Sequence, residues 1–146
     1  VKTMNIEPTK GFFIDSEVPF EEVAPGLKRQ IMGYDNKIML VKAVFEEGAV
    51  GQMHEHYHSQ VTYVESGEFE MTIDGEVRTL RAGDSFYVLP HKMHGCVCTK
   101  PGTLIDVFSP AREDFLGYPM KDGEKNNWTQ VVDHLFDRAG DRHQLH

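Results

Sequence analysis

The sequence has few cysteines, few basic residues and no long apolar run, and each shortage excludes a class of protein. Its 146 residues include only two cysteines, Cys96 and Cys98, which would be poorly placed for a disulfide two positions apart on one strand. Lys and Arg number 15 against 23 Asp and Glu, so the net charge of −8 lacks the basic surface that nucleic-acid binding needs. No apolar stretch is long enough to cross a bilayer.

These shortages, with an otherwise ordinary globular composition, indicate a single domain over residues 1–146 in a reducing compartment. The first ten residues do not show the charged-then-apolar pattern of a secretory signal. We therefore expect a cytoplasmic protein without nucleic-acid or membrane partners. A small anionic substrate is still compatible with the acidic balance, because one well-placed arginine can bind a carboxylate.

Short β-rich runs separated by turn residues follow one another through the middle of the chain. A strand is expected from Lys37, with a near-continuous apolar run over residues 38–45, and residues 69–73 alternate apolar and polar side chains, as a half-buried strand does. Asp74-Gly75 then provides a hairpin-turn signal. Further strands are expected over residues 60–64, 77–80, 85–89, 95–99 and 103–108. The pattern predicts an all-β sandwich or barrel over about residues 25–116.

The C-terminal segment has a helical period instead of a strand period. Apolar residues recur there at the spacing of one helix face, at Trp128, Val131, Val132, Leu135 and Phe136. This spacing predicts a short amphipathic helix over about residues 127–138. We expect the helix to cover the outside or an edge of the barrel, or alternatively to dock a second subunit.

Four residues have the spacing of a metal site: His54, His56, Gln60 and His94. His54 and His56 would lie two positions apart on one strand and point to one face, with Cα atoms about 7 Å apart. Gln60 would lie about 13 Å further along a straight strand, so the chain must bend over residues 57–59. His94 must come from another strand. These neutral imidazole and amide ligands suit one divalent ion, such as Ni²⁺, Fe²⁺, Zn²⁺, Mn²⁺ or Co²⁺.

The alternative is a solvent-exposed strand on which histidines have no joint role. Two features of the sequence favour the metal site instead. Gly48 and Gly67 bracket the first segment, and residues 83–94 form a second segment that runs from glycine to histidine. We assign His58 and His91 to the surroundings of the site or to the surface, not to the ligand set.

A glutamine ligand affects which chemistry a bound metal can perform. A glutamate would reduce the charge of the site from +2 to +1, whereas Gln60 leaves it at +2. The ion is then a stronger Lewis acid, and trivalent iron loses an anionic partner. This charge argument favours polarisation, proton transfer and isomerisation over dioxygenase chemistry.

A second group of candidate residues comprises Asp106, Phe108 and Arg112. Asp106 and Phe108 share one face of the expected strand, and burial of Asp106 would raise its pKa and make it a candidate general acid or base. Arg112 offers a two-pronged donor for a substrate carboxylate. The simpler alternative is that Asp106 and Arg112 pair with each other and that Phe108 belongs to the core.

The two histidine segments resemble the paired motifs of the cupin superfamily. Cupins are small double-stranded β-helix, or jelly-roll, barrels in which three histidines and usually a glutamate hold a metal. The matching positions are Gly48, His54, His56, Gly67, Gly83 and His94. The departures are Gln60 in place of the glutamate, Leu89 in place of a proline, His91 in place of a glycine and Cys98 in place of an asparagine. The superfamily match is specific for fold and metal but weak for function, because cupins have many unrelated activities.

The second group of residues narrows the resemblance to the KdgF-type cupins of pectin and alginate degradation. The similarity runs from about Pro25 to Leu116, and in that family a glutamine belongs in the metal site. The resemblance implies an isomerase-type enzyme that converts 4,5-unsaturated monouronates to the linear 4-deoxy-5-keto uronate. By position it implies a divalent metal on His54, His56, Gln60 and His94, and a substrate site lined by Asp106, Phe108 and Arg112.

Two other functions remain open at this point. One is an iron-dependent cupin dioxygenase, and the other is a cupin that binds a small ligand without catalysis. Because barrel cupins often dimerise, we also expect a homodimer.

Overall fold

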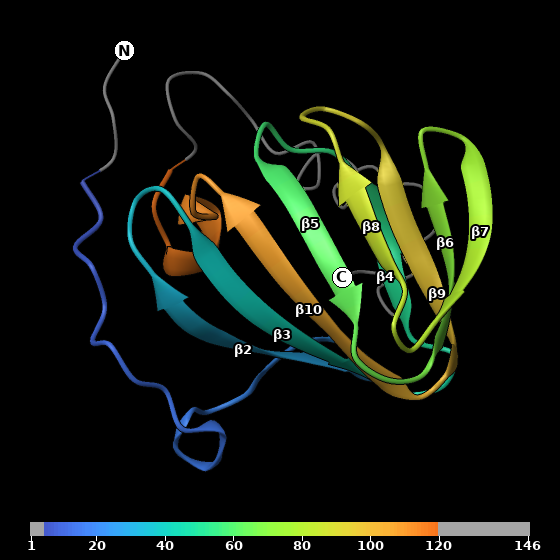
Figure 1. Cartoon of the computed structure of the whole chain (residues 1–146), viewed down its shortest axis with the longest axis horizontal. Coiled ribbons are helices and arrows are strands. Elements are labelled where there is room, and N and C mark those ends of the chain that lie inside the picture. The colour runs from blue at the N-terminus through green and yellow to red at the C-terminus, as the bar shows by residue number, and fades with distance from the viewer. Residues whose placement is uncertain (1–4, 120–146) are drawn as a thin grey trace.

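The computed structural model describes residues 5–119, which form two antiparallel β-sheets that face each other (Figure 1). The six-stranded sheet has the order β1 (Glu21–Ala24), β2 (Leu27–Tyr34), β3 (Met39–Phe45), β10 (Gly102–Ser109), β5 (Ser59–Val64) and β8 (Ser85–Val88). The four-stranded sheet has the order β4 (Val50–His54), β9 (His94–Lys100), β6 (Glu68–Ile73) and β7 (Glu76–Arg81). Two short 3₁₀ helices are η1 (Asp15–Glu17) and η2 (Glu113–Leu116). The all-β architecture expected from the sequence is confirmed.

The core between the two sheets arises from alternation along the strands. In β3, the buried side chains are every second residue, Met39, Val41, Ala43 and Phe45, and those between them are half-buried. Phe45 packs edge-on against Phe69 of β6, with ring centroids 5.1 Å apart. This contact joins the two sheets, because β3 and β6 belong to different ones.

The hairpin expected at Asp74-Gly75 is confirmed. Asp74 has φ of 49° and Gly75 has φ of 85°, and a type I′ turn requires positive φ at both central residues. β6 and β7 pair on either side of this turn, from Ile73 opposite Glu76 to the far end of both strands.

The sequence does not predict β1 and β2, because β2 buries polar side chains on both faces. Arg29 points into the barrel and lines its cavity, although it is charged. Gln30 is fully buried on the opposite face, where its Nε2 donates to the main-chain carbonyls of Asp15 (3.1 Å) and Val18 (3.0 Å). Such a strand lacks the apolar–polar alternation that identifies a half-buried strand. The barrel therefore begins at Glu21 and not at about residue 25.

Both cysteines are free thiols, as the sequence predicts, and both are buried on β9. Burial raises the pKa of Cys96 to about 12 and also raises the pKa of Cys98. Both groups are therefore protonated at neutral pH, and thiols in this form are poor nucleophiles.

Two further expectations concern helices. The helix expected over about residues 127–138 lies outside the described residues, so it stays a prediction. Within residues 5–119, the structure contains no helix with the length and apolar character needed to cross a membrane.

Candidate metal centre and substrate cavity

The three histidines predicted as metal ligands lie together in the structure. His54 ends β4 and His94 begins β9, and these neighbouring strands place the two residues opposite each other in register. Their ring centroids are 4.4 Å apart, and the ring of His56 lies 5.4 Å from that of His54 and 4.9 Å from that of His94. One ring nitrogen of each lies within 4.8 Å of the others, so one metal ion could be held by all three.

His56 does not lie on the strand that carries His54, and this part of the prediction is wrong. β4 ends at His54, and the chain bends at residues 57–58 before β5 begins. The bend itself was expected, but the strand ends earlier than expected. The bend returns the chain toward His56, so that Oε1 of Gln60 lies 3.1 Å from Nε2 of His56.

Main-chain carbonyls orient the three imidazole rings. In each ring Nδ1 lies close to such a carbonyl: that of Gln52 for His54 (2.8 Å), His58 for His56 (3.1 Å) and Lys92 for His94 (2.9 Å). Because a carbonyl only accepts hydrogen bonds, each Nδ1 carries the proton and each Nε2 keeps a lone pair. Burial lowers the pKa of His56 to about 2 and that of His94 to about 4, so both rings are neutral at pH 7.

Gln60 and His56 present lone pairs to each other, and this contact favours a cation between them. The amide nitrogen of Gln60 donates to Oγ1 of Thr62 (3.0 Å) and more weakly to Oδ1 of Asp106 (3.4 Å), which turns the amide oxygen toward His56. That oxygen then faces an unprotonated nitrogen, and Nε2 of His94 is buried with no hydrogen-bond partner among the described residues. Facing acceptors repel unless positive charge lies between them, so this set of donors fits a divalent metal.

Asp106 lies beside this group and on the same inner face of β10 as Phe108. Its carboxylate accepts a hydrogen bond from Oγ1 of Thr62 (2.6 Å) and lines the cavity of the barrel. Burial raises the pKa of Asp106 to about 6, although the bond from Thr62 and the positive charge of Arg112 oppose this effect. A carboxyl group with a pKa near neutrality can both accept and release a proton at physiological pH.

Arg112 directs its two-pronged donor at a carboxylate of the protein itself. Its Nε lies 3.0 Å from Oδ1 of Asp114 and its Nη2 lies 2.9 Å from Oδ2. The Arg112 side chain is only 3% exposed, and its guanidinium carbon lies 4.1 Å from the ring centroid of Phe115. The expected free fork for a substrate is therefore occupied. The expected alternative, a simple pair with Asp106, is not what the described residues form.

A buried network around Glu113 supports the bend that carries His56, and the sequence did not reveal it. Glu113 is 2% exposed and accepts hydrogen bonds from Nε2 of His58 (2.6 Å) and from the Tyr57 hydroxyl. Burial alone would raise the pKa of Glu113, but these two bonds lower it below its usual range. The only signal in the sequence was His58, which we assigned to the surroundings of the site. Glu113 itself lies in a charged run that is typical of a solvated surface.

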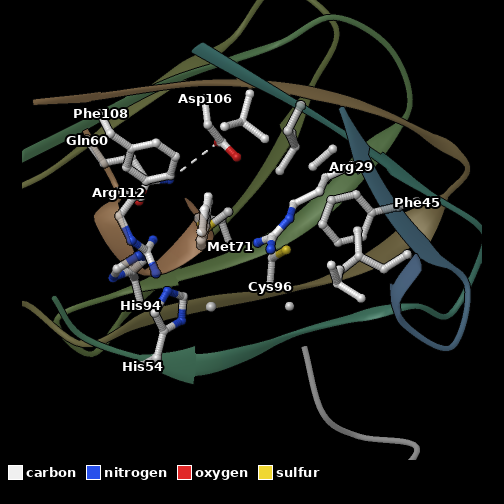
Figure 2. Close-up of a pocket in the computed structure, with 18 of the residues that line it drawn as sticks. Arg29, Phe45, His54, Gln60, Met71, His94, Cys96, Asp106, Phe108 and Arg112 are labelled. Atoms are coloured by element: carbon white, nitrogen blue, oxygen red, sulfur yellow. Dashed lines mark hydrogen bonds between the residues drawn. The ribbon is translucent and has the colours of Figure 1, made fainter. Parts of the chain in front are cut away.

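The candidate site opens into one cavity of about 420 Å³ between the sheets. Of the residues predicted for the site, His56 is not among those that line the cavity, and the other six are: His54, Gln60, His94, Asp106, Phe108 and Arg112. Figure 2 shows that Arg29 of β2 also reaches into this cavity, from a side away from His54 and His94. The sequence did not identify Arg29 as a site residue, because nothing predicted the strand that positions it.

Comparison with known proteins identifies relatives of this chain. A family model for the cupin domain matches residues 41–108. The chain is 45% identical over 107 residues to the pectin degradation protein KdgF of Dickeya dadantii (strain 3937). This alignment covers 72% of this chain and 97% of that protein.

Two solved structures are similar over the same part of the chain. An RmlC-like cupin from Shewanella frigidimarina NCIMB 400 is 49% identical with a TM-score of 0.72, over 74% of this chain and 97% of that one. KdgF from Halomonas sp. is 42% identical with a TM-score of 0.70, over 73% of this chain and 99% of that one. The two facing sheets and the inward histidines are those of a cupin. Within the cupins, the chain belongs to the KdgF family.

Proposed function

We propose that this protein is a metal-dependent enzyme of pectin or alginate degradation that opens the ring of 4,5-unsaturated monouronates and yields the linear 4-deoxy-5-keto uronate. One observation carries the proposal: Asp106 lies in the cavity against Gln60, which in turn contacts His56. A proton-transferring carboxyl group thus lies beside a set of metal donors. Membership of the KdgF family supports the same reaction, since the Dickeya relative is a pectin degradation protein.

The residues that would hold the metal are His54, His56, Gln60 and His94. Imidazole and amide groups are neutral ligands, so a divalent ion bound there would keep its full charge and polarise substrate oxygens near the anomeric carbon. The ligand set suits nickel, iron, zinc, manganese or cobalt, and it does not choose among them.

Asp106 is the proposed proton carrier. The conversion is an isomerisation: the C1 hydroxyl loses its proton, the bond from C1 to the ring oxygen breaks, and the resulting enolate takes a proton at C4. Asp106 would accept the first proton on its carboxylate and deliver a proton to C4. No oxidant is consumed, so we expect no substrate-dependent oxygen uptake, in contrast to a dioxygenase.

Phe108 and Arg112 would bind the substrate beside Asp106. Phe108 presents an aromatic ring to the cavity on the same face of β10, where a sugar ring could pack. Arg112 is held by Asp114, so it would contribute mainly positive charge near the substrate carboxylate and an ordered wall.

A direct test uses purified, metal-loaded protein and unsaturated galacturonate. Proton NMR follows the loss of the cyclic form, and an oxygen electrode follows oxygen in a parallel sample. We expect the protein to accelerate the loss of the cyclic form without oxygen uptake. No acceleration over the uncatalysed rate would refute the proposal, and substrate-dependent oxygen uptake would replace it with a dioxygenase.

Glu113 is expected to influence metal affinity although it would not touch the metal. Glu113→Gln weakens the bonds that hold Tyr57 and His58, and the His58 carbonyl orients His56. Residues that orient a metal ligand typically change metal affinity about 10- to 100-fold when they are replaced.

Competition with a fluorescent chelator measures this affinity directly, without an activity assay. Glu70→Gln is the matched control, because Glu70 is an exposed carboxylate on β6 and should leave the affinity unchanged. Equal affinity of the Glu113 variant and the wild-type protein would contradict the role of this network.

A homodimer is proposed because the outer face of the six-stranded sheet is apolar across neighbouring strands. Val107, Val61 and Tyr87 lie side by side on β10, β5 and β8, and Val61 and Tyr87 are each half exposed. Contiguous apolar surface of this kind is typical of subunit interfaces. Size-exclusion chromatography with light scattering decides the matter, and a monomer at micromolar concentration would refute the proposal.

The two free thiols support a cytoplasmic location.

A further inference from the structure

We propose that Arg29 binds the carboxylate of the substrate, an inference that rests on the function proposed above. The cavity contains two guanidinium groups, from Arg29 and Arg112, and both lie over the ring of Phe115 at 3.9 and 4.1 Å from its centroid. A uronate carries one carboxylate, so the accessibility of the donors of the two groups decides which of them can take it.

The donors of Arg29 are more accessible than those of Arg112, because the Arg29 side chain is 19% exposed and the Arg112 side chain 3%. Its Nε donates to Oε1 of Glu21 (2.6 Å), and among residues 5–119 the structure gives its two terminal amino groups no hydrogen bond. Arg112 instead commits both Nε and Nη2 to Asp114. A guanidinium binds a carboxylate best with two parallel N–H donors, and the terminal amino groups of Arg29 can provide such a pair.

The position of Arg29 fits this role. Its side chain is 19% exposed, and it lines the same cavity as Asp106 and Gln60. Figure 2 shows its guanidinium group inside the cavity, away from His54. A substrate that turns its anomeric end to the histidines could therefore direct its carboxylate toward Arg29.

The competing explanation is that Arg29 only pairs with Glu21 and packs on Phe115. Glu21 is half exposed, and ion pairs with an exposed partner contribute little to stability. The two explanations differ in what happens when Glu21 is changed. If the pair is only structural, replacing Glu21 and replacing Arg29 should have the same effect. If Arg29 binds the substrate, it should still do so when Glu21 is replaced.

Steady-state kinetics of the metal-loaded protein separate the two explanations. Arg29→Gln is expected to raise KM for unsaturated galacturonate about 10- to 100-fold with little change in kcat, because a charge-assisted pair is lost from substrate binding. Arg29→Lys keeps the charge but loses the fork, so its KM should lie between those of the wild type and the glutamine variant. Glu21→Gln and the exposed control Arg81→Gln should leave KM within about threefold of the wild-type value.

Binding of a non-reacting ligand makes the test independent of turnover. Isothermal titration with saturated galacturonate and with its methyl ester compares an anionic with a neutral ligand. The wild-type protein should prefer the acid about 10- to 100-fold, and Arg29→Gln should lose this preference.

Each outcome decides one question. Equal KM values for Arg29→Gln and Glu21→Gln, or an acid preference that survives in Arg29→Gln, would overturn the role of Arg29. If the wild-type protein fails to convert the unsaturated sugar, the proposed reaction is wrong, and the acid-to-ester comparison still tests Arg29. If Arg29→Gln does not fold, Arg29→Lys and the wild-type comparison of acid with ester carry the test.

Discussion

Replacing Asp106 with asparagine is expected to slow the conversion about 1,000-fold while the protein still binds its metal, because general acid–base groups typically contribute 100- to 10,000-fold. The substitution keeps the shape of the side chain and an oxygen that can accept the hydrogen bond from Thr62. It removes the ability to take up and release a proton. The measurement is kcat from the NMR assay, together with the metal content of the same sample from elemental analysis.

The metal content distinguishes a catalytic from a structural role for Asp106. Because Asp106 also lies 3.4 Å from the amide nitrogen of Gln60, its loss could disturb the donor set instead of the proton transfer. Loss of metal together with activity would assign Asp106 to structure, and unchanged activity would exclude it from the reaction. Glu76→Gln is a suitable control, since it removes an exposed carboxylate on β7 outside the cavity.

Removal of the metal is expected to reduce the activity at least about 1,000-fold, as the loss of a Lewis acid worth several kcal/mol would do. It should also lower the melting temperature, because the metal binds the folded chain and not an ordered site in the unfolded one. Dialysis against a chelator followed by single additions of nickel, iron, zinc, manganese or cobalt measures both effects. The ion that restores the highest rate identifies the best cofactor.

Substitution of individual histidines tests the ligand set in the same experiment. His56→Ala should lose metal and activity together, and added metal should not restore it. His91→Ala is the matched control, since the His91 side chain is half exposed and lies outside the proposed ligand set. Full activity in protein shown to be free of metal would exclude a metal-dependent reaction.

The sequence predicted that the four candidate metal donors lie together, because this grouping depends mainly on residue type and spacing. The bend over residues 57–59 followed from strand geometry alone, since His56 and Gln60 on a straight strand would be too far apart for one ion. The end of β4 at His54 could not be read from the sequence, because it depends on pairing with β9. The strand pattern, the hairpin at Asp74-Gly75 and the free thiols were likewise visible in local sequence.

The roles of the arginines could not be predicted, because they depend on which groups meet across the fold. Arg112 has the right position in the motif, but nothing in the sequence identified Asp114 as its partner. Arg29 lies on a strand whose burial pattern has no simple period, more than 70 residues before Asp106 in the chain. Only the pairing of β2 with β3, which in turn pairs with β10, brings it to the cavity.

Residue chemistry and periodicity were sufficient to predict the all-β class of fold and to propose the neutral metal donors and the proton carrier, because these properties belong to side chains and their spacing along a strand. The closed barrel decided the rest. Nearby main-chain carbonyls determine which nitrogen of each histidine carries the proton. Hydrogen bonding of the Gln60 amide turns its oxygen toward His56, and burial raises the pKa of Asp106. The barrel also left the donors of Arg29 more accessible than those of Arg112, which is only 3% exposed and pairs with Asp114. These features depend on the neighbours that surround each group, and neighbours distant in the chain exist only in the folded molecule.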